Sequence, residues 1–278
     1  MTDVSERDGI LEPWPAQALA ALIDVPEPSD VLPLGWHWIY LLEHPRQEDI
    51  GADGHPLHNT VPAPPRPGLR RMWAGGRLTY YGELRIGEHT TRRSTLTSLT
   101  EKQGRSGPLT FAKVEHALSQ HGEVKLVEHQ DLVYRPIAPV ADSGDHVSDG
   151  PDDAFTPRPL GLAAHERAIP VSETLLFRFS ALTYNAHRIH YDRDYATKIE
   201  GYPDLVTHGP LQALIMAETA RAAGLQTVTG LCFEYRLLAP LFLSQGMIAG
   251  ASTSSSGVQT YVRDYTGRQT ATGSITSR

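Results

Sequence analysis

Residues 206–224, VTHGPLQALIMAETARAAG, constrain the fold more strongly than any other segment of the chain. Pro210 stands where the first helical residue belongs and Gly224 where the helix should stop, so the segment predicts a helix between them. Its apolar side chains leave almost no polar face, and such a helix has to be buried nearly all round. The rest of the chain must therefore supply a layer of structure that surrounds it.

Runs of β-forming residues separated by glycine turns predict that layer. Strands that alternate between apolar and polar residues are typical of an antiparallel sheet with one buried face. The chain repeats the same order twice, a helical element followed by a meander of strands, with little identity between the two copies. The expected elements are a helix at 12–25, strands over 77–135, a strand at 173–185, the buried helix, and strands over 229–278.

A segment rich in proline, glycine, serine and aspartate separates the two copies. It shows neither strand nor helix periodicity, which is typical of a linker or a long surface crossing. We expect an N-terminal domain at 1–135, a linker at 136–164 and a C-terminal domain at 165–278. A second proline-rich stretch, residues 55–68, predicts a long surface loop, and such loops are often functional.

The composition limits the classes of partner. The net charge of −7 argues against nucleic acid or an anionic membrane as a main partner. The N-terminus is acidic and has no apolar run, so no signal peptide is expected. The sequence contains no run of 18 apolar residues, so no membrane span is expected either. The single cysteine, Cys232, excludes disulfide scaffolds and is expected to be a small core residue. We expect a cytoplasmic location.

Residues 182–192, LTYNAHRIHYD, concentrate polar and titratable groups in an apolar surrounding. Buried asparagine and histidine can be purely structural, tying loop backbone groups together. The alternative is a catalytic site, because residues 207–210, THGP, place a free backbone amide and a positive dipole end at the head of the buried helix. A histidine acid/base beside such an amide suits enolate chemistry next to a carbonyl.

Residues 179–196 and 200–213 resemble the MaoC-like hydratases and dehydratases, specifically the branch of the mitochondrial-type 3-hydroxyacyl-thioester dehydratases and mesaconyl-CoA hydratases. Weaker similarity extends over the first half, at 34–44, 70–84, 101–111 and 130–135. The resemblance implies an α+β double hot-dog fold, in which two antiparallel sheets, each wrapped around a helix, are fused in one chain. It further implies a degenerate, substrate-binding N-terminal domain and a C-terminal domain with the catalytic motif.

The same resemblance implies a hydro-lyase that adds or removes water across the α/β carbons of an acyl thioester. The substrate would be an acyl-CoA or an acyl-carrier-protein thioester. No separate cofactor is expected, because CoA or phosphopantetheine is part of the substrate. A homodimer is also expected from the family.

Family roles transfer to individual positions of this sequence. His190 matches the catalytic histidine, and Gly209 matches the glycine whose amide faces the thioester oxygen. The aspartate of the family falls on Asn185, and its asparagine falls on His187. An amide cannot take up a proton at neutral pH, so we expect His190 alone to transfer the proton while Asn185 holds the water or hydroxyl.

Several further residues have two interpretations. His187 is either a second polar clamp or a surface imidazole, and His208 either fixes the start of the helix or touches substrate. Tyr184 and Tyr191 either pack or line an acyl pocket. No carboxylate accompanies His187, His190 and His208, so no metal site is expected.

A group of basic residues beside the proline-rich loop has two interpretations as well. The group is either a solvated face or a binding site for the phosphates of the thioester carrier, which suit arginine. It comprises Arg66, Arg70, Arg71 and Arg77, with Lys102 and Arg105 as further members or as parts of a plain turn.

Two other functions remain open from the sequence. A hot-dog thioesterase would need a carboxylate near the helix head, and Glu218 lies two turns further along the helix. A non-catalytic acyl-thioester-binding subunit would be consistent with an asparagine at position 185.

Overall fold

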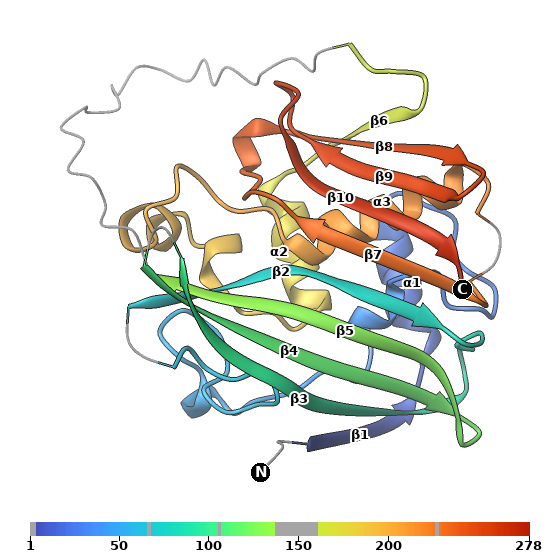
Figure 1. Cartoon of the computed structure of the whole chain (residues 1–278), viewed down its shortest axis with the longest axis horizontal. Coiled ribbons are helices and arrows are strands. Elements are labelled where there is room, and N and C mark those ends of the chain that lie inside the picture. The colour runs from blue at the N-terminus through green and yellow to red at the C-terminus, as the bar shows by residue number, and fades with distance from the viewer. Residues whose placement is uncertain (1–3, 66–67, 105–106, 137–160, 226–227) are drawn as a thin grey trace.

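The computed structural model describes residues 4–65, 68–104, 107–136, 161–225 and 228–278. Within these residues, ten strands form one continuous antiparallel sheet, and the helices lie on one side of it (Figure 1). The strands are β1 (Val4–Ile10), β2 (Leu69–Tyr80), β3 (His89–Gly104), β4 (Gly107–Gln120), β5 (Glu123–Pro136), β6 (Glu166–Ile169), β7 (Leu231–Leu237), β8 (Met247–Ser254), β9 (Gly257–Arg263) and β10 (Gln269–Ser277). The α-helices are α1 (Pro13–Leu22), α2 (Glu173–Leu182) and α3 (Gly209–Ala222). Short helical turns are η1 (Trp36–Ile39), η2 (Gln47–Asp49), η3 (Arg188–His190), η4 (Tyr195–Ile199) and η5 (Leu243–Gln245).

Two meanders join edge to edge in this sheet. The strand order is β1-β3-β4-β5-β2-β7-β10-β9-β8-β6, so the first half of the chain supplies one side and the second half the other. The junction is the pairing of β2 with β7, where Gly76 lies opposite Tyr235 and Leu78 opposite Phe233. The α+β fold with two fused meanders is thereby confirmed. The domain limits at 135 and 165 stay a prediction, because residues 137–160 of the expected linker lie outside the described residues.

Helix α3 fulfils the constraint that its sequence imposes. All ten residues from Leu211 to Ala220 are buried, including the polar Gln212, Glu218 and Thr219. The helix packs against β8, β9, β10 and β2, so strands of both meanders cover it. The predicted buried helix is confirmed, and it begins at Gly209.

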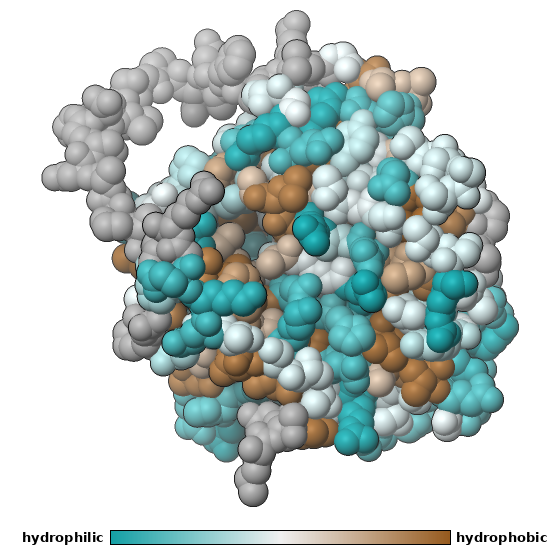
Figure 2. Space-filling view, viewed as in Figure 1, coloured by the Kyte–Doolittle hydropathy of each residue, from teal (hydrophilic) through white to brown (hydrophobic). Residues whose placement is uncertain are grey.

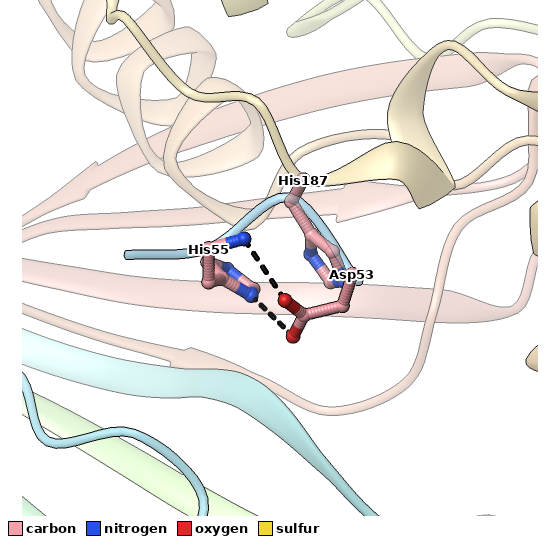
Figure 3. A group of neighbouring side chains, drawn as sticks. All are labelled: Asp53, His55 and His187. Carbon is pink, nitrogen blue, oxygen red and sulfur yellow. Dashed lines mark hydrogen bonds and ion pairs between the residues drawn. The ribbon is translucent and has the colours of Figure 1, made fainter. Parts of the chain in front are cut away.

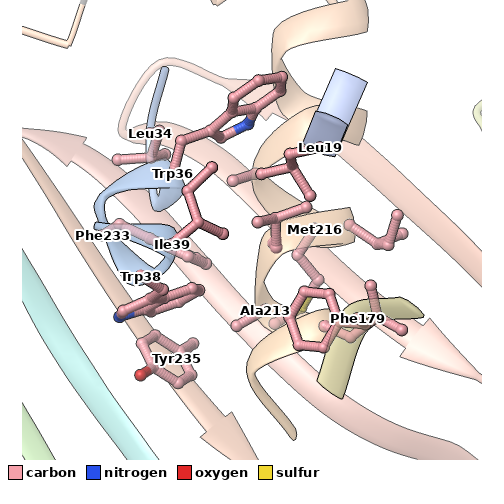
Figure 4. Close-up of a cluster of buried hydrophobic side chains, with 14 of the residues drawn as sticks. Leu19, Leu34, Trp36, Trp38, Ile39, Phe179, Ala213, Met216, Phe233 and Tyr235 are labelled. Atoms are coloured by element: carbon pink, nitrogen blue, oxygen red, sulfur yellow. The ribbon is translucent and has the colours of Figure 1, made fainter. Parts of the chain in front are cut away.

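One core joins the two halves of the chain. Trp36 and Trp38 from η1 meet Phe179 of α2, Met216 of α3 and Tyr235 of β7 (Figure 4). Because the same apolar cluster contains residues from both copies of the pattern, neither half buries its apolar face alone.

The predicted strand at 173–185 is wrong, because residues 173–182 form helix α2. Ser172 caps this helix by accepting a hydrogen bond from the Leu175 amide at 3.1 Å. The buried side chains Leu176, Phe179 and Ser180 follow a spacing of three and four residues, which is helical. The strand was predicted because phenylalanines and leucines dominate the segment. The Ser172 cap and the helical spacing of the buried residues favour the helix instead.

The other expectations for the elements hold. Helix α1 has prolines in its first turn and packs beside α2 and η1. Cys232 lies on β7 but is only half-buried, so the expectation that it is a core residue is wrong. No helix among the described residues is both long and apolar enough to cross a membrane. Hydrophilic and hydrophobic residues are interspersed over the outer face of the sheet (Figure 2).

Candidate active site

A cavity of about 420 Å³ lies where the two halves of the chain meet. Its walls come from the end of α2 and η3, from the head of α3, and from β2 to β5 together with the loop that precedes β2. His190 and Gly209, which the sequence predicts to act together, both line it. So do Asn185, Tyr184 and His187.

His190 is held in one orientation and one tautomer. Its Nδ1 lies 2.7 Å from the Val206 carbonyl oxygen, and a carbonyl accepts only, so Nδ1 carries the proton. In the neutral ring, Nε2 therefore has the free lone pair. Burial lowers the pKa of His190 to about 4, although the Val206 hydrogen bond opposes this shift. At neutral pH the side chain is a neutral base.

His208 connects His190 to the head of α3. Its ring stacks on the His190 ring with centroids 3.6 Å apart, and its Nε2 lies 2.8 Å from the Ser180 hydroxyl. His208 is fully buried and is the N-cap residue of α3, immediately before Gly209. Of the two interpretations of His208, the one in which it fixes the helix start agrees with these contacts.

The amide of Gly209 is the first of the helix. Among the described residues, none accepts a hydrogen bond from it, as expected for the first turn of a helix. A Cβ at this position would meet Cδ1 of Leu237, so a larger residue would require the Leu237 side chain to move. Glycine also lets a ligand approach the backbone, so the contact with Leu237 is a second reason for glycine here.

Asn185 follows α2 at a sharp turn. Tyr184 has a left-handed φ of 51° there, and its exposed ring lies edge-on to His44 at 5.0 Å. The Asn185 Oδ1 accepts a hydrogen bond from the His187 amide at 3.0 Å. Its Nδ2 group is a donor and has no hydrogen-bond partner among the described residues.

Two residues of the site, Asp53 and His55, are missing from the sequence-based prediction. Asp53 accepts hydrogen bonds from the His55 backbone amide and side-chain Nδ1, both at 2.9 Å. The His55 ring lies 4.0 Å from the His187 ring, and the three side chains point toward one another (Figure 3). His187 is buried, so its interpretation as a surface imidazole is wrong.

The loop that carries Asp53 is fitted closely to the segment that carries His187. Gly54 has a φ of 90°, and a Cβ there would collide with the Ala186 carbonyl. The Arg188 amide donates to the Asp53 carbonyl at 2.9 Å. The partners in these contacts are far apart in the sequence, so no local pattern reveals them; the only sequence signal is the Asp-Gly-His order itself.

The trio of Asp53, His55 and His187 has donor types that suit a metal ion, with ligand atoms within 4.8 Å of one another. However, Asp53 already engages His55 Nδ1, and the two imidazole rings lie one over the other, tilted by 38°. Burial lowers the pKa values of both histidines well below the usual range, so both are neutral. The geometry is that of a carboxylate that orients a histidine.

The predicted arginine group divides among different environments. Arg70 is buried, donates to the Glu200 carbonyl at 3.2 Å and lies over the Tyr202 ring. Arg77 is exposed and forms an ion pair with Glu234. Arg71 alone of these three lines the cavity.

Of the remaining members of this group, the structure describes Lys102, which does not line the cavity. Lys102 is exposed on β3, with its Nζ 5.5 Å from the Phe111 ring centroid. Arg66 and Arg105 lie outside the described residues.

Glu218, the carboxylate considered for thioester hydrolysis, has a structural role. It accepts hydrogen bonds from the Trp36 indole at 2.8 Å and from Arg221 at 2.6 Å. It is buried and does not line the cavity.

Comparison with known proteins gives a consistent result. The sequence profile of the hydroxyacyl-thioester dehydratase type 2 family matches residues 35–243. A mesaconyl-C(4)-CoA hydratase from Chloroflexus aurantiacus is 43% identical over 82% of this chain and 79% of its own length. A mitochondrial hydroxyacyl-thioester dehydratase type 2 from Schizosaccharomyces pombe is 27% identical over 76% of this chain and 74% of its own.

Solved structures agree on the fold. A MaoC-like dehydratase superimposes with a TM-score of 0.66 at 15% identity, covering 99% of this chain and 97% of that one. A Mycobacterium tuberculosis protein described as having a double hot-dog fold gives a TM-score of 0.55 at 12% identity, covering 99% and 95% of the two chains. The expected double hot-dog fold is thereby confirmed.

Proposed function

The chain belongs to the hydroxyacyl-thioester dehydratase type 2 family, whose members are hydro-lyases that act on acyl thioesters. We propose that the addition or removal of water takes place in the cavity beside His190. The observation that carries the proposal is the shared cavity, which His190 and the head of α3 both line. The substrate in this proposal is a short enoyl or 3-hydroxyacyl thioester of CoA.

In the hydration direction, Nε2 of His190 accepts a proton from water while the water oxygen bonds to the β carbon. The electrons of the double bond shift toward the thioester carbonyl, and the resulting enolate oxygen accepts a hydrogen bond from the Gly209 amide. The imidazolium then returns its proton to the α carbon. One water has been added and His190 is neutral again; dehydration is the reverse sequence.

The surroundings support these roles. The tautomer that Val206 imposes leaves the lone pair on Nε2, as a base requires. An oxyanion donor of the Gly209 kind is worth roughly 2.7–4 kcal/mol of barrier in other enzymes. The Nδ2 group of Asn185 is the available donor for the oxygen of the water or hydroxyl, since its Oδ1 holds the His187 amide.

A spectrophotometric assay with crotonyl-CoA and mesaconyl-CoA tests the proposal. We expect consumption of the double bond, and a loss of about 10²–10⁴-fold in kcat for His190→Ala, the usual contribution of an acid/base side chain. The exposed His89, which pairs with Asp8, provides the control variant His89→Ala, which should retain the rate.

The proposed mechanism fails if His190→Ala turns over at the wild-type rate. Release of free thiol without loss of the double bond would indicate a thioesterase instead. Tight binding of acyl-CoA without turnover across a panel of substrates would indicate a binding subunit.

A further inference from the structure

The reacting water carries a second hydrogen for which His190 and Asn185 offer no acceptor. When the water oxygen attacks the β carbon, one hydrogen passes to Nε2 of His190, and the Asn185 Nδ2 group can donate to the oxygen. An amide that turns its Nδ2 toward this oxygen turns its Oδ1 away from it, and Oδ1 already accepts from the His187 amide. The second hydrogen stays on the oxygen and becomes the hydroxyl hydrogen of the product. An unpaired hydroxyl in a buried site is costly, so a further side chain should accept this hydrogen.

The His187 ring lies beside His190 and has no hydrogen-bond partner of its own. Its residue is 6% exposed and lines the cavity. The His187 and His190 ring centroids are 5.4 Å apart, and the two rings are nearly perpendicular. Among the described residues, no group forms a hydrogen bond with either ring nitrogen of His187. Buried polar groups normally have a partner, so this ring is suited to a polar atom of the substrate or of water.

His187 can accept a hydrogen bond because its ring is neutral. Burial lowers the pKa of His187 well below the usual range, and the charges of His55 and His190 act in the same direction. A neutral imidazole has one N–H group and one nitrogen with a free lone pair. The negative charge of Asp53 opposes the lowering of the pKa, so it makes the ring a better acceptor than burial alone would leave it.

A loop of the first half of the chain holds the His187 ring in place. The His55 ring lies over it, with centroids 4.0 Å apart (Figure 3). The Asp53 carboxylate only accepts, so the His55 Nδ1 that lies 2.9 Å from it carries the proton, and this bond fixes the His55 ring. Gly54 lets the loop backbone approach the Ala186 carbonyl closely. The position of His187 therefore depends on contacts from both halves of the chain.

The Thr207 hydroxyl is another polar group that lines the cavity and is buried without a partner. Thr207 precedes Gly209 by two residues, so it lies at the head of α3, on the side of the thioester oxygen in the proposed site. His187 follows Asn185 in the turn after α2, on the side of the water. This arrangement favours His187 as the acceptor and makes Thr207 an informative comparison.

We propose that His187, held in place by Asp53 and His55, accepts the second hydrogen of the reacting water. In the dehydration direction it accepts the hydroxyl hydrogen of the 3-hydroxyacyl group. His187 remains neutral throughout, while His190 takes up and returns the proton. The first half of the chain thereby contributes positioning residues to the reaction centre. This inference rests on the proposed function and adds to its site.

Two reactions separate the oxygen side of the chemistry from its carbon side. Hydration of crotonyl-CoA requires both sides. Exchange of the α hydrogens of butyryl-CoA in D₂O, followed by NMR, requires only His190 and the Gly209 amide, because no oxygen bonds to the β carbon. In His187→Leu we expect kcat for hydration to fall roughly 10- to 100-fold, the usual effect of losing the partner of a buried polar group. The exchange rate and the calorimetric Kd of butyryl-CoA should stay within a few-fold of wild type.

His58→Leu is the matched control, because His58 is exposed in the same loop as His55 and does not line the cavity. It should leave hydration, exchange and binding unchanged. His187→Gln, whose amide oxygen can still accept a hydrogen bond, should recover part of the hydration rate lost in His187→Leu.

A double-mutant cycle tests the positioning role of the loop. His55→Leu should lower the hydration rate while leaving exchange within a few-fold of wild type. Combined with His187→Leu it should cost little more than His187→Leu alone, because both changes remove the same interaction. Additive losses would show that His55 does not act through His187.

Thermal unfolding verifies that each variant is folded, and His55→Leu carries the same comparison if His187→Leu does not fold. The inference is overturned if His187→Leu hydrates crotonyl-CoA at the wild-type rate, or if hydration and exchange fall together. A selective loss of hydration in Thr207→Val, with none in His187→Leu, would assign the acceptor to Thr207 instead. Wild-type protein that hydrates neither crotonyl-CoA nor mesaconyl-CoA would refute the proposed hydro-lyase activity itself.

Discussion

At the scale of single residues, the proposed chemistry depends on which nitrogen of His190 holds the proton. Val206 fixes the proton on Nδ1, and burial keeps the ring neutral, so the base is ready without any change of state. The position of His190 and Gly209 in one cavity was predictable, because both residues lie in short motifs of the sequence. Asp53 and His55 were not, because they reach the site from a loop that is distant in sequence.

The pH dependence of kcat/KM follows from the lowered pKa of His190. A base must be unprotonated, so activity should be constant down to about pH 5 and should fall tenfold per pH unit below about pH 4. Crotonyl-CoA is the suitable substrate because its acyl group does not titrate. An acid limb near pH 6.5, the ordinary histidine value, would contradict the assignment.

Asn185→Asp restores the carboxylate of the broader family. The new side chain can still accept a hydrogen bond from the His187 amide. Its negative charge, however, stabilises the protonated form of the His190 imidazole. We therefore expect the acid limb of kcat/KM to move up by about one pH unit. The same titration in Asn185→Ser, which adds no charge, should stay at the wild-type position; an unmoved limb in the aspartate variant would place residue 185 too far from His190.

At the scale of elements, the site is assembled by the fit between the Asp53 loop and the turn after α2. The sequence predicted α3 correctly because an almost entirely apolar helix permits only a buried position. The sequence did not predict α2, because residues that favour strands obscured its cap and its helical spacing. It also did not predict the contact of the Asp53 loop, because that contact depends on tertiary packing.

Gly54→Ala tests that contact. Gly87 has a similar φ of 84°, against 90° at Gly54, but no atom lies within 4 Å of the position that its Cβ would take, so Gly87→Ala isolates the backbone cost alone. That cost is about 1–2 kcal/mol of unfolding free energy. Gly54→Ala should lower the free energy of unfolding by more than this backbone cost. It should also lower kcat/KM at least about tenfold, because the displaced site residues are no longer aligned with the substrate.

Chemical denaturation and the hydratase assay measure both effects. Equal destabilisation of the two variants, with kcat/KM unchanged in both, would show that the loop contact does not position the site.

At the scale of the whole molecule, one sheet and one core bind the two meanders together, and the cavity lies where they meet. The repeated pattern of helix and meander allowed the fold class to be predicted. The continuity of the sheet through β2 and β7 could not be predicted, because it depends on pairing between strands of different halves.

The buried histidines make the stability of the whole chain pH-dependent. His190 has a folded-state pKa of about 4 and His116 of about 3, both below the unfolded value near 6.5. Between these values the unfolded chain binds more protons, so the free energy of unfolding should fall as the pH is lowered from about 7 to about 4. Each histidine contributes up to about 1.4 kcal/mol per pH unit.

Urea unfolding at a series of pH values measures this slope. His116→Gln should make it shallower, since one titrating group is removed. A free energy of unfolding that does not change across this window would mean that these histidines are already protonated or exposed in the folded chain.

The convergence of His190 and the Gly209 amide on one thioester is best examined in a crystal structure with butyryl-CoA bound. We expect the thioester oxygen to lie about 2.7–3.1 Å from the Gly209 amide nitrogen, with the α and β carbons facing Nε2 of His190. A thioester oxygen turned away from the head of α3, or an acyl group that never reaches His190, would refute the proposed site.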